Sequence, residues 1–362
     1  MDEFDSRLNI IVGPNAVGKT SVLEALSLST NLKSFRTHQL KELIKSDETE
    51  AMISAQFELP TVSKVQIAFQ GSRRMIRIDE KAISTRSKFP FLGGSISFSP
   101  DDLLLIKASP DGRRDFLDEL AVSQDPEFIL ALQKFEKSLK QRNAVLKLIK
   151  NSEAGEDQLE IWTENFISSA IPIYRERLKI VQKLNSELST TYQQVFNVHE
   201  KIVINYLHRF EERLTDDAQS VEDLLRKKLL IYREIEKASG HSLVGPHKDD
   251  FDIAIDGMSA RSFGSQGQTR GLVIALKILQ LELTREKRQM SPILLLDDII
   301  SELDDLRVQA LIRYLAHYPG QMFVTTAEIN KVKALHSEFS NFKVIDMKEH
   351  ISEALGSLGV AL

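Results

Sequence analysis

The sequence predicts an α/β fold into which a long helical lobe is inserted. Two short apolar runs, Leu8 to Val12 and Ile293 to Leu296, have the composition of buried strands. A glycine-rich loop and a helix with an apolar face follow the first run. Between the two runs, residues 115–238 show mainly helical periodicity. One α/β unit is therefore split in the sequence by a helical segment.

Length and pattern together set the expected domain boundaries. A chain of 362 residues is longer than one typical domain. We predict a first lobe made of residues 1–110 and 241–362, and a second, helical lobe made of residues 111–240. The hydrophobic fraction of 42% is ordinary for a globular protein and is enough for a sizeable core.

Composition excludes several kinds of site. The sequence has no cysteine, so disulfides, thiolate metal sites and cysteine nucleophiles are excluded. No apolar run approaches the ~20 residues that a membrane-spanning helix needs, and the acidic N-terminus is unlike a signal peptide. These features predict a cytoplasmic protein. The net charge of −5 gives no overall signal for nucleic-acid binding, although it leaves room for a local basic face.

An antiparallel layer is expected after the first helix. Residues 51–59, 64–69 and 73–78 have strand-like composition, with a turn signal at Gly71-Ser72. Asp256-Gly257 is a hairpin signal. The remaining expected elements are helices at 159–200, kinked or broken at Pro172, at 221–238 and at 268–286, with strands at 251–255, 322–326 and 342–347.

The glycine-rich loop matches the phosphate-binding pattern G-x-x-x-x-G-K-[ST] in full. Its residues are Gly13, Pro14, Asn15, Ala16, Val17, Gly18, Lys19 and Thr20. Glycines let the main chain curl so that N–H groups face phosphate oxygens, and the following helix adds the positive end of its dipole. We expect Lys19 to neutralise the β- and γ-phosphates and Thr20 to ligate Mg²⁺. The flanking strand and helix disfavour the alternative of a glycine-rich turn that matches by chance.

An acidic pair, Asp297-Asp298, ends the second apolar run. A carboxylate at the end of a central strand lies beside the loops at that edge of the sheet. Asp297 is the candidate ligand of Mg²⁺, and Asp298 could orient or deprotonate the attacking water. An acidic turn after a core strand is common, so the motif gains its meaning from the phosphate loop in the same chain.

A third motif precedes a helix and consists of Ser265, Gln266, Gly267 and Gln268. A serine at this place can simply cap the helix. Its position about 30 residues before the acidic pair is the order found in ABC-type ATPases, where this signature contacts the γ-phosphate held by a second subunit. We therefore predict an ABC-type head that dimerises around ATP. Ser301 to Asp304 occupies the place of the loop that crosses such a dimer interface, or is an ordinary acidic helix start.

Taken together, these residues resemble the RecF family of DNA replication and repair proteins. The narrowest part of the resemblance is Gly-Pro-His-Lys-Asp-Asp at 245–250, followed by Ser-Gln-Gly-Gln. The segments that carry it, besides the phosphate loop, are Leu28 to Thr30, Ser34 to Thr37, Phe98 to Pro100, Arg113 to Asp118, Leu243 to Asp250, Ser265 to Arg270 and Pro292 to Asp304. An Asp at 298, where many ABC heads carry Glu, also fits this family.

The resemblance implies a cytoplasmic ATPase related to SMC proteins, which binds ATP and Mg²⁺ and forms an ATP-dependent homodimer. It further implies binding to gapped or single-/double-strand junction DNA, cooperation with RecR and RecO, and loading of RecA. Lys19 and Asp298 are the expected catalytic residues of a slow, DNA-stimulated hydrolysis of ATP to ADP and phosphate.

The N-terminus departs from the family pattern. RecF-like chains usually begin with a further strand carrying an Asn-Phe-Arg-like motif about twenty residues before the phosphate loop. Here twelve residues precede Gly13. We expect either a start assigned too late or a missing first strand, and the residues that hold the adenine are not identified.

Two other functions compete with an ATP-driven DNA clamp. The first is a nucleotide-switched DNA-binding scaffold without productive hydrolysis, which the short N-terminus motivates. The second is the energy-supplying subunit of a transporter. The helical insert of ~120 residues and the RecF-like segments argue against the second function.

Basic residues offer two candidate surfaces for DNA. Arg73, Arg74 and Arg77 lie in the expected hairpin. A helical row contains Lys134, Lys137, Lys140, Arg142, Lys147 and Lys150. A solvated face is the simpler explanation for each residue, and the hairpin is the preferred surface. Arg113 and Arg114 could serve a lobe junction or the ATP site, and His247 is expected to be structural.

Overall fold

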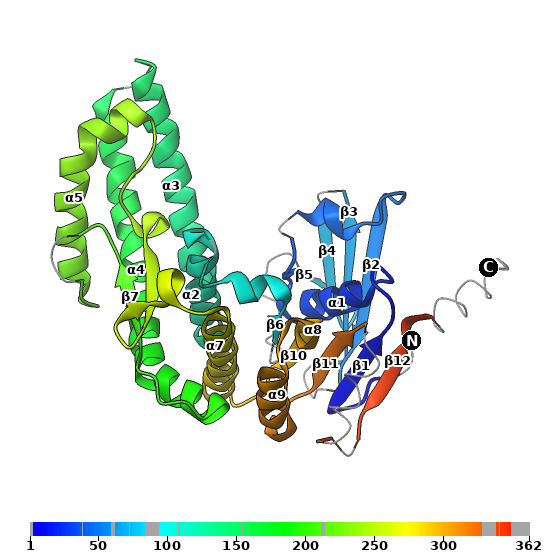
Figure 1. Cartoon of the computed structure of the whole chain (residues 1–362). Helices are drawn as coiled ribbons and strands as arrows, with labels where there is room; N and C mark the ends of the chain where they lie inside the picture. Colours follow the sequence, from blue (N-terminus) through cyan, green and yellow to red (C-terminus); the bar gives the residue numbers. More distant parts are fainter. Residues whose placement is uncertain are drawn as a thin grey trace. The chain divides into compact units, whose positions relative to one another are not determined.

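The computed structural model describes residues 3–37, 39–58, 62–71, 73–83, 94–107, 109–153, 155–210, 214–327, 338–339 and 341–348. The chain forms two compact units (Figure 1). Unit 1 consists of Met1–Asp102 with Thr284–Leu362, and unit 2 is Leu103–Leu283. Unit 2 thus starts near the predicted boundary at 110 but extends past 241, so that the Ser265–Gln268 segment belongs to it.

Unit 1 is built on a five-stranded sheet in which every recorded pair of neighbouring strands is parallel. In spatial order its strands are β12 (Lys343–Asp346), β1 (Leu8–Val12), β11 (Met322–Thr326), β10 (Ile293–Asp297) and β6 (Ser95–Phe98). All five residues of β1 and of β11 are buried, as expected for central strands that are covered on both faces. The fold class predicted from the sequence is confirmed.

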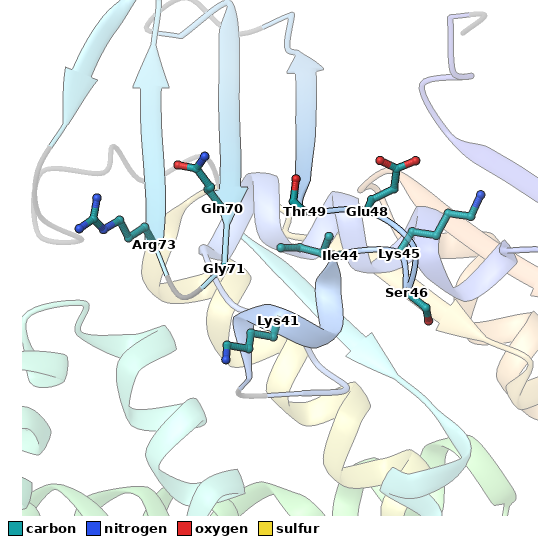
Figure 2. Close-up of a pocket in the computed structure, with 9 residues that line it drawn as sticks. All are labelled: Lys41, Ile44, Lys45, Ser46, Glu48, Thr49, Gln70, Gly71 and Arg73. Atoms are coloured by element: carbon teal, nitrogen blue, oxygen red, sulfur yellow. The ribbon is translucent and has the colours of Figure 1, made fainter.

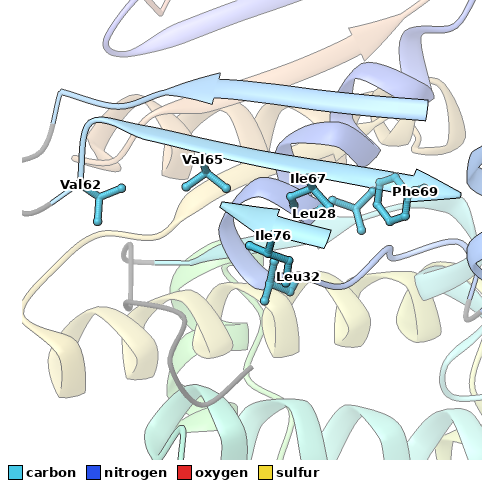
Figure 3. Close-up of a cluster of buried hydrophobic side chains, with 7 residues drawn as sticks. All are labelled: Leu28, Leu32, Val62, Val65, Ile67, Phe69 and Ile76. Carbon is cyan, nitrogen blue, oxygen red and sulfur yellow. The ribbon is translucent and has the colours of Figure 1, made fainter. Parts of the chain in front are cut away.

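An antiparallel sheet forms a second layer of unit 1. Its strands are β2 (Glu50–Gln56), β3 (Lys64–Gln70), β4 (Arg73–Ile78) and β5 (Lys81–Ile83). Alternate residues of β3 are buried, and Val65, Ile67 and Phe69 join Leu28 and Leu32 in one core cluster (Figure 3). Leu28 lies in the helix α1 (Lys19–Asn31), so this layer packs on the helix that follows the phosphate loop.

Unit 2 is mainly helical. Its helices are α2 (Pro110–Gln124), α3 (Phe128–Lys150), α4 (Glu156–Phe196), α5 (Ala218–Ser239), α6 (Ala260–Phe263) and most of α7 (Gln266–Arg288). The sequence predicts a kink or break at Pro172, and the break is wrong, because α4 is one continuous helix. Proline removes a single main-chain donor, whereas buried side chains such as Ile167 and Tyr174 hold the helix on both sides of it. No helix in the described part of the chain is long and apolar enough to cross a bilayer.

A strand interrupts the segment that the sequence predicts to be helical. β7 (Ile202–Leu207) pairs antiparallel with β8 (Asp250–Ile255), which turns into β9 (Met258–Ser259). The turn residues Asp256 and Gly257 have φ angles of 49° and 84°, so the predicted hairpin is confirmed. Within the described residues, β7 pairs with one strand, β8, which lies about fifty residues later, so local periodicity could not reveal it.

Arg142 is a correction to the helical row of basic residues. Its side chain is 2% exposed and forms an ion pair with Glu236 of α5, with 2.6 Å between Nη2 and Oε2. Its other nitrogens donate to the hydroxyls of Ser242 and Thr163. Glu236 Oε1 accepts the main-chain N–H of Leu243 at 2.7 Å. Arg142 therefore ties three segments of unit 2 together and cannot track DNA phosphates.

We expect Arg142→Ala to lower the free energy of unfolding of unit 2 by about 3–5 kcal/mol, because Glu236 would remain as a buried, uncompensated charge. The paired replacement Arg142→Met with Glu236→Gln removes both charges but keeps an oxygen to accept the N–H of Leu243, so it should recover most of that loss. Hydrogen exchange of amides in α3 and α5 would measure both changes. Lys140→Ala, an exposed change on the same helix, is the control. A loss below about 1 kcal/mol for Arg142→Ala would contradict this role.

Candidate nucleotide-binding site

The phosphate loop connects the end of β1 to the start of α1. A Cβ atom on Gly13 would lie 2.9 Å from Cγ1 of Val17 and 3.1 Å from Cβ of Met347, so no larger residue fits without a shift. Gly18 precedes α1 with a φ of 101°, and Ala16 also has a positive φ of 66°. Left-handed residues alternating with ordinary ones bend a main chain into an anion-binding nest. The loop thus has the conformation that its sequence pattern requires.

Lys19 is held against the loop itself. Its side chain is 7% exposed, and Nζ donates hydrogen bonds to the carbonyl oxygens of Gly13 at 2.8 Å and Pro14 at 3.0 Å. A lysine fixed in this way adds its positive charge to the N-terminal end of α1, where the helix dipole is also positive. Phosphate oxygens bound by the loop would meet that charge directly.

The structure brings Thr20 and Asp297 together. The Thr20 hydroxyl donates to Oδ1 of Asp297 at 2.9 Å. Thr20 lies in the first turn of α1 and Asp297 ends β10, so the two residues are far apart in the sequence. β11 lies between β1 and β10 in the sheet, and its Thr325 is the register partner of Asp297. The Thr325 hydroxyl donates to the same Oδ1 at 2.8 Å. The Asp297 carboxylate therefore joins the phosphate loop to two further strands.

Asp298 is held by Thr325, which no sequence motif included, and by Ser301 of the Ser301–Asp304 segment. It has a φ of 50°, and its main-chain N–H donates to the hydroxyl of Thr325 at 2.9 Å. Its carboxylate oxygen Oδ1 accepts a hydrogen bond from the hydroxyl of Ser301 at 2.7 Å. A left-handed conformation is costly for a residue other than glycine, so these two bonds help to maintain it. The only sequence signal for Thr325 was its place at the end of an apolar strand.

The residues available for Mg²⁺ fit a nucleotide-bound ion. Within the described ranges, no group of three or more His, Asp or Glu residues could hold a metal by itself. Mg²⁺ in nucleotide sites is held by one or two protein oxygens together with phosphate oxygens and water. The Thr20 hydroxyl and the Asp297 carboxylate, 2.9 Å apart, supply such a pair.

The Ser265–Gln268 segment has a capping geometry in unit 2. The Ser265 hydroxyl accepts the N–H of Gln268 at 3.1 Å, and the Gln268 side-chain oxygen accepts the N–H of Ser265 at 3.0 Å. This reciprocal pair is a capping box at the start of α7. Gln268 also donates to Glu200 at 2.9 Å. A role of these residues toward nucleotide stays a prediction.

The Ser301–Asp304 segment runs from the last two residues of α8 (Ile299–Glu302) to the residue that precedes α9 (Asp305–His317). Asp304 caps α9 by accepting the N–H of Arg307 at 3.1 Å. The simpler explanation for its acidic character, a helix start, is therefore realised. Ser301 has the additional contact with Asp298 described above.

The Gly-Pro-His-Lys-Asp-Asp segment is a buried polar support within unit 2. Arg113 is 1% exposed and makes two hydrogen bonds to Asp250, at 2.6 and 2.9 Å, while Arg114 donates to the main-chain oxygen of Asp249. His247 belongs to no metal-ligating group in the described part of the chain. Its Nε2 atom lies 3.2 Å from the main-chain oxygen of Ser242, and burial lowers its pKa to about 4. Burial also raises the pKa of Asp249 to about 7, although Arg177 and the Tyr206 hydroxyl act in the opposite direction.

Comparison with known proteins agrees with this geometry. A family model described as an AAA domain matches residues 3–239. The DNA replication and repair protein RecF of Halothermothrix orenii is 30% identical, with 92% of this chain and 90% of that protein covered. RecF of Gloeobacter violaceus is 35% identical, with 91% of this chain and 88% of that protein covered. The chain belongs to the RecF family.

RecF structures share the fold as well. The structure of the recombination mediator protein RecF-ATPrS in the RecFOR pathway matches with a TM-score of 0.81 at 30% identity, and covers 91% of this chain and 89% of its own. The corresponding RecF-ATP structure matches with a TM-score of 0.78. A RecF relationship over nine-tenths of the chain accounts for both units and for the split nucleotide-binding lobe.

We expect Thr325→Val to lower the rate of ATP turnover by about 10-fold or more, because both aspartates lose a hydrogen-bond partner. Nucleotide affinity should change little, since Gly13 to Lys19 are untouched. Single-turnover hydrolysis and a fluorescent-nucleotide titration would measure the two quantities. Thr325→Ser, which keeps the hydroxyl, should retain turnover. Equal losses for the valine and serine variants would contradict the assignment.

The Asp249 carboxyl predicts a pH dependence of stability. An unfolded aspartate has a pKa of about 3.9, whereas the folded pKa is about 7. Its stabilising contribution is therefore complete below the unfolded pKa and is lost as pH rises through about 7. We expect Asp249→Asn to unfold at a higher temperature than the wild type at about pH 8, with a smaller gain at about pH 5. Thermal unfolding curves that differ by the same amount at both pH values would contradict this.

Proposed function

We propose that this protein is an ATP-dependent DNA-binding protein of recombinational repair and replication. The observation that carries the proposal is the Asp297 carboxylate, which accepts hydrogen bonds from Thr20 of the phosphate loop and from Thr325 of β11. Membership of the RecF family supplies the biological setting. A protein with this site would bind ATP in the phosphate loop, and its affinity for DNA would depend on whether ATP is bound.

The loop residues would divide the work of holding the triphosphate. Main-chain N–H groups from Gly13 to Gly18 would donate to the β- and γ-phosphates, and Lys19 would release its carbonyl partners to pair with them. Thr20 and Asp297 would hold Mg²⁺, which when bound neutralises phosphate charge. Asp298, fixed by Thr325 and Ser301, would orient the attacking water and accept its proton.

The proposal includes a homodimer that forms with ATP. Ser265 to Gln268 of one copy would approach the γ-phosphate held by Lys19 of the other, so that two copies complete each site. The start of α7 supports this step, because main-chain N–H groups at a helix start favour anions. Slow hydrolysis would then reopen the dimer. Gapped or junction DNA, RecR and RecO as partners, RecA loading and a cytoplasmic location belong to the same proposal.

A nucleotide switch without productive hydrolysis is the second candidate. The contact that favours it is the hydrogen bond from Ser301 to Oδ1 of Asp298, since it occupies one of the two carboxylate oxygens that an attacking water would have to contact. In that case binding and release of ATP alone would control the dimer.

We expect Lys19→Ala to weaken ATP binding by about 10- to 100-fold, because charge-assisted hydrogen bonds to phosphate contribute about 1.5–3 kcal/mol. ATP-dependent dimer formation should be lost at the same nucleotide concentration. Equilibrium titration and light scattering would measure these effects. A variant that binds ATP and dimerises like the wild type would refute the phosphate-loop assignment.

Asp298→Asn separates the two candidate functions. If the protein is an ATPase, the variant should lose turnover on gapped DNA but keep ATP binding and dimer formation, because the amide cannot accept the proton of water. Phosphate release with gapped DNA would measure turnover. Turnover that is absent from the wild type as well would favour the switch.

A further inference from the structure

A basic groove lies at one end of the antiparallel sheet of unit 1, apart from the phosphate loop in sequence and lining (Figure 2). Its volume is about 690 Å³, and it is broadly open to solvent. The groove is formed by the segment that contains η1 (Leu40–Leu43) and by the hairpin end of β3 and β4. Three cationic side chains line it, Lys41, Lys45 and Arg73, together with the polar side chains of Ser46, Thr49 and Gln70.

Hydrophobic packing turns the two lysines toward solvent. Leu40, Leu43 and Ile44 pack against the core cluster that Figure 3 shows, and so attach this segment to the sheet. Lys41 lies between Leu40 and Leu43, and Lys45 follows Ile44. Both lysines are exposed. The cations therefore stand on a fixed backbone, even though their side chains are flexible.

Strand alternation decides which arginines of β4 face solvent. Arg74 points inward and donates to the main-chain oxygen of Leu32 at 2.8 Å, so it supports the layer instead of offering a free charge. Arg73 is exposed and lines the groove, and Arg77 is exposed further along the same face of the strand. The structure thus separates the three hairpin arginines, and Arg73 is the one that lines the groove together with the two lysines.

Among the residues that line the groove, cations outnumber carboxylates. Glu48 is the one acidic residue in this lining, beside Lys41, Lys45 and Arg73. Glu42, Asp47 and Glu50 belong to the same segment but do not line the groove, and Glu50 accepts a hydrogen bond from Gln70 at 2.6 Å. Within the described part of the chain, none of Lys41, Lys45 and Arg73 has a recorded ion pair, whereas Arg226, Arg233 and Lys237 of unit 2 are each paired with glutamates.

We infer that this groove binds the phosphate backbone of DNA. An enclosed pocket lined by apolar groups suits a small ligand, whereas a shallow opening with spread cations and hydroxyls suits an extended polyanion. Lysine, arginine, serine, threonine and glutamine are the side chains that commonly contact DNA phosphates. The inference rests on the proposed ATP-dependent binding of DNA and names the surface that makes the contact.

The matched test compares two triple variants that remove equal charge. Lys41→Ala/Lys45→Ala/Arg73→Ala empties the groove of cations, and Lys134→Ala/Lys137→Ala/Lys140→Ala removes three exposed lysines from one face of α3. Binding of a fluorescent gapped duplex would be titrated with ATP at several salt concentrations. Thermal unfolding and binding of a fluorescent ATP analogue would show that both variants fold and hold nucleotide.

We expect the groove variant to reduce the slope of log affinity against log salt by about 2 to 3, since each lost phosphate contact removes about 0.9. The helix variant should keep the slope of the wild type. Equal slopes for the groove variant and the wild type, or equal reductions in both variants, would overturn the inference while leaving the proposed function intact. An unchanged DNA slope with lost binding of polyglutamate would assign the groove to an acidic protein segment instead. A wild-type protein that fails to bind DNA with ATP would overturn the proposed function and this inference together.

Discussion

The Asp297 carboxylate is the point on which the candidate site depends. Its Oδ1 atom accepts hydrogen bonds from Thr20 and Thr325, and so links the phosphate loop, β10 and β11. Without this carboxylate, none of the side-chain hydrogen bonds described above would connect β10 and β11 to the phosphate loop. Because the bonds converge on one oxygen of a side chain that is 9% exposed, the loop and the acidic pair have a fixed relation before any ligand is considered. The position of Asp298 follows, since its N–H bonds to the same Thr325 hydroxyl.

Unit 2 uses buried charge for a different purpose. Arg142, Arg113 and Arg177 are all nearly inaccessible, and each forms an ion pair with a carboxylate from another element of this unit. Such pairs add little net stability compared with apolar packing, but breaking one is costly. They therefore specify how the helices and the β7–β8–β9 sheet fit together. We interpret the polar Gly-Pro-His-Lys-Asp-Asp segment as part of this internal framework.

Much of the architecture could be predicted because its signals are local. The loop from Gly13 to Thr20, the strand before Asp297 and the turn at Asp256-Gly257 each depend on a few neighbouring residues. β6 and β7 were missed because their identity comes from distant partners, and the serines of β6 interrupt its apolar pattern. Arg142 was wrongly assigned to the exposed basic row. Helical spacing shows which residues share a face of a helix, but it does not show that Glu236 of another helix packs against that face. Thr325 carries no motif, and Ser301 belongs to the Ser301–Asp304 segment without any sequence signal for its contact with Asp298. Only the folded structure shows what the two hydroxyls touch.

The order of strands in unit 1 has a consequence for folding during synthesis. β1 is made first, yet both of its neighbours, β11 and β12, come from the far end of the chain. Met347, which packs against Gly13, comes later still. A nascent chain that leaves the ribosome would therefore carry an unpaired apolar strand throughout most of its synthesis, while the helical unit can already fold. Long-range parallel pairing is slow to form. Chaperone protection of residues near Leu8 to Val12 would thus matter more for this protein than its final packing suggests.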